Sequence, residues 1–397
     1  MLHKTCFLVC GVLLLSLGWS KATFAQVVNG DKVLGRHQDD VESVAIAPND
    51  FYVATGSWDN TVQVFSGDSS FRHLQTLDGH NAAVSAISFS GKADRLVTAG
   101  RDYKIMIWNR VGEQKFELER ELNMVHTAGI NSLFVGPYGN MIYSGGYDGK
   151  IVIYNMRKDS RRIIDNRLPV NDIALSSTRQ FIYCADESPI VKMYDGIGNK
   201  IRDLKGHTDV VNAVACNNQY ILTGSSDQTA IIWDVARGKK KRVLEGHTWK
   251  VTSVAISADG KYAITGSTDG TTKIWDIETG KEVKSFSEEN AIVRQVVMSR
   301  NMQFVFTAMH MDTSVHYESY GASVWRSGLE FDPTVVRPIT PEMVHGNPTM
   351  ARRGGSSQTR ATSRKTRPAK QPEKPKINPD AEIITNTNEI QITIEDE

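Results

Sequence analysis

The chain has 397 residues, 40% of them hydrophobic, and carries 46 basic and 45 acidic side chains for a net charge of +1. This hydrophobic content excludes wholesale disorder, and the charge balance argues against a nucleic-acid coat or a polyacidic solvating protein. Four cysteines are too few for a disulfide scaffold or a cysteine-rich zinc module.

The N-terminus has the composition of a secretory signal peptide. Lys4 precedes an apolar run over residues 6–17, and small residues up to Ala25 precede a cleavage site before Gln26. The apolar run is shorter than the ~20 residues that a spanning helix needs. We therefore expect residues 1–25 to be removed and the mature chain to be exported, either periplasmic or secreted; an uncleaved membrane anchor is the alternative. The chain has no Asn-x-Ser/Thr acceptor in which x is a residue other than Pro, which favours a bacterial export route.

The following 300 residues or so repeat one unit seven times. In the sixth copy, residues 246–276, two β-type runs flank an Asp-Gly turn, and a second Asp-Gly turn leads into the run TTKIWD. Asp-Gly turns between such runs predict β-hairpins. No stretch shows sustained helical periodicity, so we expect strands and no helices.

Four columns of similar residues stay in register through the copies, with a period of roughly 40–45 residues. The columns are His37, His80, His126, Asn166, His207, His247 and Glu289; Thr55, Thr98, Ser144, Cys184, Thr223, Thr265 and Thr307; Asp59, Asp102, Asp148, Ser188, Asp227, Asp269 and Met311; and Phe65, Trp108, Tyr154, Tyr194, Trp233, Trp275 and Tyr317. Cys184 and Cys216 fall at different repeat positions, so we expect two separate buried thiols rather than a disulfide.

These copies resemble the WD-repeat family. Gly-His pairs open copies at 79–80, 206–207 and 246–247, and Trp-Asp pairs close copies at 233–234 and 275–276. The resemblance covers residues 27–326 and implies an all-β fold, a seven-bladed β-propeller of four-stranded antiparallel blades. The fourth and seventh copies lack both the His and the turn acid, so we expect packing alone to hold those two blades.

The resemblance also implies that the N-terminus supplies the outer strand of the last blade. We assign residues 27–34 to that strand, pairing beside the strand that ends at Tyr317. The rival is the local run at residues 322–325. We favour the N-terminal strand because ring closure leaves fewer free strand edges.

In five copies the His, hydroxyl and Asp residues together look like a nucleophilic triad. An enzyme needs one such set in one cleft, whereas this chain repeats the set once per blade. We therefore expect a buried relay in which Asp accepts from His, His engages the hydroxyl, and the hydroxyl meets an aromatic partner. The expected aromatic partners are Trp108, Tyr154, Trp233 and Trp275; Phe65 lacks a donor. This interpretation predicts no catalytic residue and no cofactor.

Two further patterns are weaker. His310 and His316 flank Asp312, but a metal site needs three or four convergent ligands, and we expect none here. The pair Gly196 and Gly198 lacks a third glycine and opens no helix, so nucleotide binding is not expected.

The resemblance implies that a partner protein docks on the face formed by the turn-acid and His loops. The positions concerned are the third and fifth after each His and the one before each turn acid. They include Asp40, Glu42, Trp58, Arg101, Asn131, Tyr147, Asn171, Glu187, Asn212, Lys250, Thr252, Arg294 and His310. The set holds aromatic and arginine residues, which are enriched at binding hot spots. Acids cluster on the first copy and bases on the second, sixth and seventh.

These features predict a non-enzymatic protein-interaction scaffold. The alternative is a propeller that binds a small molecule, or catalyses a reaction, in its central channel. That alternative requires convergent ionisable residues unique to one or two blades. A polar rim that is merely solvated is the third interpretation.

After the repeats we expect a linker at 327–350, a disordered basic segment at 351–376 and an acidic tail at 377–397. The basic segment carries nine basic residues and one acid. The tail alternates Ile390, Ile392 and Ile394, which predicts a short strand. We expect a flexible extension; the alternatives are a strand added to a partner's sheet and contact with an anionic envelope surface. Nucleic acid is not expected as a partner.

Overall fold

A computed structural model describes residues 32–136, 138–176, 180–288, 290–311 and 320–330. Within these ranges the secondary structure consists of strands and turns without helices, so none of the described segments is an apolar helix that could cross a membrane. The expected signal peptide, linker beyond 330, basic segment and acidic tail lie outside the described residues.

The 28 strands form seven antiparallel sheets of four strands each. In chain order the strands are β1 (Lys32–His37), β2 (Val41–Ile46), β3 (Tyr52–Ser57), β4 (Val62–Ser66), β5 (His73–Leu77), β6 (Val84–Phe89), β7 (Arg95–Gly100), β8 (Ile105–Val111), β9 (Lys115–Leu122), β10 (Ile130–Val135), β11 (Met141–Gly146), β12 (Lys150–Asn155), β13 (Ser160–Asp165), β14 (Val170–Leu175), β15 (Phe181–Asp186), β16 (Ile190–Asp195), β17 (Lys200–Lys205), β18 (Val211–Cys216), β19 (Tyr220–Ser225), β20 (Ala230–Asp234), β21 (Lys239–Leu244), β22 (Val251–Ile256), β23 (Tyr262–Ser267), β24 (Thr271–Asp276), β25 (Glu282–Ser287), β26 (Ala291–Met298), β27 (Phe304–Met311) and β28 (Tyr320–Arg326).

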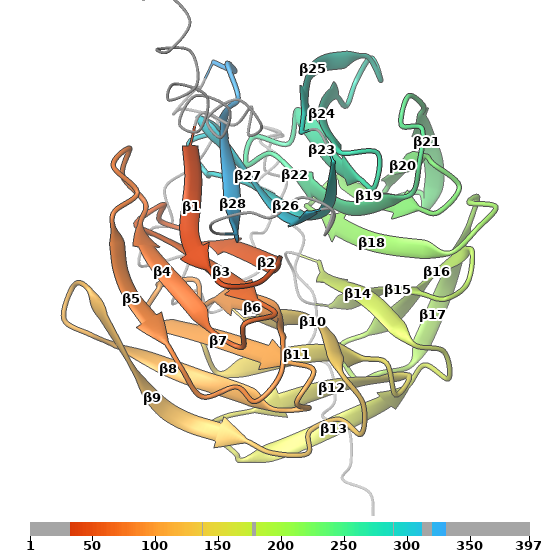
Figure 1. The fold of residues 1–397 in the computed structure, drawn as a ribbon. Coiled ribbons are helices and arrows are strands. Elements are labelled where there is room, and N and C mark those ends of the chain that lie inside the picture. The colour runs from red at the N-terminus through yellow and green to blue at the C-terminus, as the bar shows by residue number, and fades with distance from the viewer. Residues whose placement is uncertain (1–31, 137, 177–179, 289, 312–319, 331–397) are drawn as a thin grey trace, which may run out of the picture. The chain divides into compact units, whose positions relative to one another are not determined.

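The expected seven-bladed propeller is confirmed. Blades one to six take four consecutive strands each, from β2 to β25, and blade seven combines β26, β27 and β28 with β1. The first strand of every blade packs against the first strand of the next, and β26 packs against β2. The seven first strands therefore close into a ring around a channel of about 640 Å³ (Figure 1).

The hairpins form because the residue after each turn acid adopts a left-handed backbone. Its φ is 74° at Gly149 and 77° at Gly270, and also positive at Asn60, Tyr103 and Gln228. Glycine reaches this region without strain, which explains the Asp-Gly pairs at 148–149 and 269–270. At the other three positions the turn acid accepts hydrogen bonds that stabilise the same turn; Asp59, for example, accepts from the Thr61 amide at 2.9 Å.

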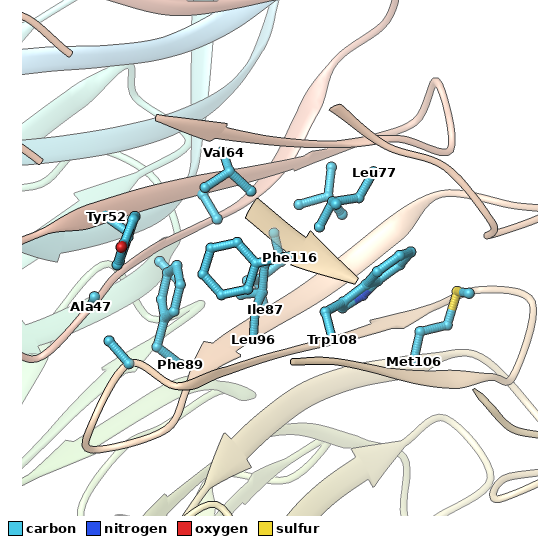
Figure 2. Close-up of a cluster of buried hydrophobic side chains, with 14 of the residues drawn as sticks. Ala47, Tyr52, Val64, Leu77, Ile87, Phe89, Leu96, Met106, Trp108 and Phe116 are labelled. Atoms are coloured by element: carbon cyan, nitrogen blue, oxygen red, sulfur yellow. The ribbon is translucent and has the colours of Figure 1, made fainter. Parts of the chain in front are cut away.

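Apolar side chains fill the spaces between neighbouring blades, because no blade can bury both of its faces alone. Figure 2 shows such a layer between blades one and two. The Tyr52 ring packs edge-on against Phe116, with ring centroids 5.4 Å apart, and Phe89 lies beside both rings. Trp108 and Met106 extend the same buried cluster.

A second set of contacts joins the blades at their outer edges. The fourth strand of each blade carries a long polar side chain opposite the middle of the third strand, and this side chain donates to the outer part of the next blade. The acceptor lies in or beside the hairpin between the third and fourth strands, except that Lys284 donates to the Arg326 carbonyl at the end of β28. The donors are Gln75, Arg120, Arg162, Arg202, Arg242, Lys284 and Lys32. Arg162, for instance, donates to the Ile197 carbonyl at 2.7 Å. The contacts run from each blade to its neighbour through the whole ring.

The last blade closes with an N-terminal strand, but not in the register we expected. β1 pairs antiparallel with β28, so that Lys32 lies opposite Val324. The rival run at 322–325 is the third strand of this blade rather than its outer strand. Residues 27–31 and Tyr317 lie outside the described residues. The error arose because Thr307 and its aromatic partner, Trp325, are 18 residues apart, against 10 in the second, fifth and sixth copies.

Leu34 anchors β1 to the core, being 1% exposed, whereas its neighbour Val33 is 38% exposed. We expect Leu34→Ala to lower the free energy of unfolding by about 2–4 kcal/mol, since it leaves a cavity at the ring closure. Val33→Ala is the matched control and is expected to change it by less than about 0.5 kcal/mol. Chemical denaturation of both variants measures this. Equal effects would show that β1 is not fastened through its inward face.

Candidate functional site at the channel mouth

Five blades hold the His–hydroxyl–Asp arrangement. In blades one, two, three, five and six the His Nδ1 atom lies 2.9–3.0 Å from the turn Asp, and Nε2 lies 2.7–2.8 Å from the Thr or Ser hydroxyl. The carboxylate also accepts from a backbone amide, that of Thr248 in blade six. Trp108, Trp233 and Trp275 donate to the threonine hydroxyls at 2.9–3.0 Å.

The arrangement fixes which ring nitrogen carries the proton when the imidazole is neutral. A carboxylate only accepts, so the neutral imidazole carries its proton on Nδ1 and accepts the hydroxyl proton on Nε2. Burial lowers the pKa of His126 and His207, which keeps both rings neutral, although Asp148 and Asp227 oppose the shift. Burial is the largest single influence and raises the pKa of the Asp carboxylates. The hydrogen bonds from His, a backbone amide and a threonine, with the interaction with the His charge, together outweigh it and hold the pKa of Asp59 and Asp269 well below the usual range.

None of these hydroxyls can act as a nucleophile on an outside substrate. Thr55, Thr98, Thr223 and Thr265 are 0% exposed and Ser144 is 1% exposed. Each lies on the second strand of its blade, between neighbouring strands, so that no substrate reaches it. The arrangement satisfies buried polar groups and ties the start of each blade to its turn.

Tyr154 does not take part in this arrangement, contrary to our expectation. Its hydroxyl contacts Asp159 and accepts from Arg120 at 2.8 Å, away from Ser144. A Tyr hydroxyl projects beyond the position of an indole Nε1, so it reaches the outer hairpin instead of the buried hydroxyl. In blade three, Tyr154 therefore takes part in the outer contacts between blades rather than in the buried relay.

The fourth blade is not held by packing alone, which corrects a second expectation. Asn166 takes the place of His and donates to Asp186 at 2.9 Å, while the Tyr194 hydroxyl donates to Asn166 at 2.8 Å. Lys192 forms an ion pair with Asp186 at 2.5 Å, and Ser188 donates to the same carboxylate. Asp186 is fully buried. A different set of residue types thus forms an equivalent network.

The seventh blade also keeps polar contacts. Trp325 donates to Thr307 at 3.1 Å, and Ser323 donates to the buried carboxyl of Glu288 at 2.5 Å. The Glu288 amide donates to the Gly270 carbonyl, as the Asn166 amide does to Gly149, so Glu288 rather than Glu289 begins this blade in the place of His. Burial raises the pKa of Glu288 to about 7.

Four of the residues expected to bind a partner connect adjacent blades. Asn131, Asn171, Asn212 and Thr252 sit at a bulge in the first strand, and each donates to the bulge carbonyl of the next blade at 2.6–3.0 Å. Ser85, which we did not assign, makes the same contact with Ile130. Because a carbonyl only accepts, the amide nitrogens face the next blade.

Glu42 and Arg294 occupy the same bulge position in blades one and seven but form a different group. Glu42 accepts from Trp58 Nε1 at 2.9 Å and from Arg101 at 3.4 Å, and Arg294 approaches it to 3.8 Å. His310 pairs with Asp40 on the neighbouring blade. The acidic first copy and the basic second and seventh copies therefore meet at the channel mouth.

An exposed strip runs over blades one, two and three. The Arg101 guanidinium stacks over the Trp58 ring at 4.6 Å. Gly129 lies beside both Arg101 and Tyr147, since a Cβ atom there would be 3.6 Å from each. Trp58 is 40% and Tyr147 43% exposed. We call Trp58, Arg101 and Tyr147 the mouth strip. Glu187 and Lys250 are also exposed, on blades four and six.

The channel wall contains one further acid that the sequence analysis did not assign. Asp172 accepts from Ser132 at 2.7 Å and from the Val214 amide at 2.9 Å, which joins blades three, four and five. Burial raises its pKa to about 6. Among the described residues no group of three His, Cys, Asp or Glu side chains converges as a metal site, and Asp312 and His316 lie outside them. Cys184 and Cys216 are free thiols.

The buried relay should contribute measurably to the free energy of unfolding. We expect His247→Ala to lower the free energy of unfolding by about 1–3 kcal/mol, because Asp269 and Thr265 lose a buried hydrogen-bond partner. His73→Ala, at an exposed position, is the control and should have little effect. An unchanged denaturation midpoint for His247→Ala would contradict the structural role.

The buried carboxyl group of Glu288 should make the free energy of unfolding depend on pH. Its folded-state pKa of about 7 lies above its ordinary value of 4.5, so its contribution to stability is complete below about pH 4.5 and is lost as pH rises through 7. We expect Glu288→Gln to reduce the loss of unfolding free energy between pH 5 and pH 8 by roughly 2–3 kcal/mol. Taking the difference between the unfolding free energies at the two pH values cancels any pH-independent cost of the substitution. If the unfolding free energies of the two proteins changed with pH in parallel, the proposed role of Glu288 would be refuted.

Known proteins share this repeat. The family model described as WD domain, G-beta repeat matches residues 31–66, 71–109, 118–155, 198–234 and 238–276. The chain is 27% identical over 190 residues to a guanine nucleotide-binding protein subunit beta of Solanum tuberosum, covering 46% of this chain and 41% of that protein. It is 24% identical over 274 residues to a Denticleless protein homolog of Danio rerio, covering 55% of this chain and 41% of that protein.

A third relative is Pre-mRNA-processing factor 19 homolog 2 of Arabidopsis thaliana, 27% identical over 191 residues, covering 47% of this chain and 36% of that protein. The chain thus spans about two fifths of the length of these relatives. The matched copies, together with the observed sheets, show that this chain contains WD40 repeats closed into a seven-bladed β-propeller.

Proposed function

We propose that this chain is a non-enzymatic interaction scaffold and that a partner protein docks on its channel-mouth face. The observation that carries the proposal is the mouth strip, where two half-exposed aromatic rings and an arginine lie side by side over three blades. Trp, Tyr and Arg are the residue types most enriched among interface hot spots. The ring holds them rigidly, which lowers the entropy lost on binding.

Two further observations support a scaffold over an enzyme. The five triad-like sets have buried hydroxyls, so they offer no nucleophile at a surface. One relative is named as a subunit, which places that protein in a larger assembly. We carry only the general expectation of a protein partner from it to this chain.

The channel supports a second candidate, binding of a small molecule. Asp172 and Arg294 line this channel. No other blade has an ionisable residue at the position of Asp172, and at the position of Arg294 only blade one has one, Glu42. Asp172, however, has both oxygens engaged by neighbouring blades. A thermal-shift screen of metabolites separates the candidates, because a channel ligand raises the midpoint of the purified chain without any protein partner.

We also propose that residues 1–25 direct export to the periplasm or outside the cell. The order of a basic residue, an apolar run and small residues supports it. Mass spectrometry of the protein from its native source tests it, with a mature N-terminus at Gln26 expected. An intact N-terminus on intracellular protein would overturn it.

The docking proposal predicts a selective loss of binding. We expect the variant Trp58→Ala, Arg101→Ala, Tyr147→Ala to lose a protein that the unaltered chain captures from extract of its source. The control replaces Leu118, Arg161 and Ile163 on the outer strands, which are exposed as well, by alanine. Quantitative mass spectrometry compares the three captures. Loss from the control but not from the mouth variant would place the docking surface on the outer edge instead.

A further inference from the structure

One side of the channel mouth carries more positive charge than its carboxylate balances. Arg101, after β7, and Arg294, on β26, both approach Glu42, on β2. The same carboxylate also accepts from the Trp58 indole. A single Glu42 therefore serves two guanidinium groups and an N–H donor from three adjacent blades.

Both guanidinium groups keep a donor unused. The Nε atoms of Arg101 and Arg294 are shielded from solvent and have no hydrogen-bond partner within the part of the chain that the structure describes. Buried donors without an acceptor are uncommon in native proteins and call for an explanation. The Arg294 Nε atom lies 3.8 Å from Glu42, beyond hydrogen-bond distance. The two side chains are 34% and 37% exposed, so an acceptor can approach the exposed part of each side chain from the face, although not the shielded Nε atoms themselves.

Among the residues that the structure describes, the nearby charges do not supply this acceptor. Asp40 is paired with His310. Lys250 on blade six adds another exposed cation to the same face. Arg101 is also held in place by the Trp58 ring, so less rotamer freedom remains to be lost on binding.

We propose that the channel mouth binds an acidic peptide segment of a partner protein, with one of its carboxylates held between Arg101 and Arg294. This inference rests on the proposed docking function and names the chemistry of the partner. Guanidinium groups bind carboxylates through charge-assisted, often bidentate hydrogen bonds, which suits two converging arginines. The exposed rings of Trp58 and Tyr147 then pack against the neighbouring peptide residues.

The channel wall on blades three and four complements such a peptide. The Nδ2 atoms of Asn131 and Asn171 donate to backbone carbonyls of the next blade, so these two side chains offer their Oδ1 atoms as acceptors. Both residues line the channel. Peptide N–H groups are their natural donors. The mouth thus presents donors for a carboxylate on one side and acceptors for a peptide backbone on the other.

A random-peptide display selection on the purified full-length chain tests the inference. We expect the selected peptides to share an Asp or Glu. Their affinity, measured by fluorescence anisotropy, should fall roughly tenfold or more with Arg101→Gln and with Arg294→Gln, the loss expected for one charge-assisted hydrogen bond. Arg95→Gln is the matched control, because Arg95 pairs with Glu119 outside the mouth, and it should not change the affinity.

Glu42→Gln provides a change in the opposite direction. The internal carboxylate competes with the peptide for both arginines, so its neutralisation should raise the affinity for the selected acidic peptides by roughly threefold or more. Damage to the fold would lower affinity instead, and the thermal midpoint of each variant checks for it. An affinity that falls with Glu42→Gln while the midpoint is unchanged would overturn the inference.

The other outcomes are also distinguishable. Selected peptides without acids that depend on Trp58 and Tyr147 would overturn the acidic-peptide inference and leave the docking function standing. Peptides that bind equally to all mouth variants would overturn both. A selection that enriches no peptide above background would likewise overturn the inference, since a preformed site for such a segment should select one.

Discussion

The pairing of β1 with β28 is the contact on which the rest of the structure depends. It joins residues almost 300 positions apart, Lys32 and Val324, and turns seven stacked sheets into a closed ring. Each blade buries its second face only because the next blade is present, and the ring leaves no terminal blade with an uncovered face. The channel and its mouth exist only in the closed form, so Glu42 of blade one meets Arg294 of blade seven through this closure.

Polar residues in this ring fall into two groups that differ in how they repeat. Residues that recur at one position serve the ring itself: the His–hydroxyl–Asp sets inside the blades, the bulge amides that contact the next first strand, and the outer cations that contact the next hairpin. Glu42, Arg294 and Asp172 differ from the residues at their positions in most other blades. Asp172 still joins three blades, whereas Glu42 and Arg294 meet at the mouth.

Much of the fold could be predicted from the sequence, because each repeat folds by the same local rules. Registered His, hydroxyl and Asp residues predicted seven blades and the contacts inside five of them. The fourth blade escaped prediction because Asn166, Asp186 and Lys192 changed together, which column-by-column comparison cannot detect. The seventh was misaligned by the longer interval between Thr307 and Trp325.

The site was harder to predict. The bulge asparagines repeat at intervals of about 40 residues, as do Arg162, Arg202 and Arg242 on the outer strands, and this regularity was a usable sign of a structural role. We interpreted the asparagines as partner-binding and gave the arginines no role, because a sequence does not show which side of a strand faces the next blade. The convergence of Arg101 and Arg294 on one carboxylate depends on ring closure, which brings the second and seventh copies to either side of the first.

Site-specific photocrosslinking in the native source tests the central claim, that the mouth strip is the working surface, most directly. A photoreactive phenylalanine derivative would replace Tyr147 in one protein and Ile163, of similar exposure on an outer strand, in another. The account predicts that the derivative at position 147 crosslinks to one discrete protein and that the derivative at position 163 does not crosslink to that protein. Crosslinks to a discrete protein from position 163 alone would contradict it.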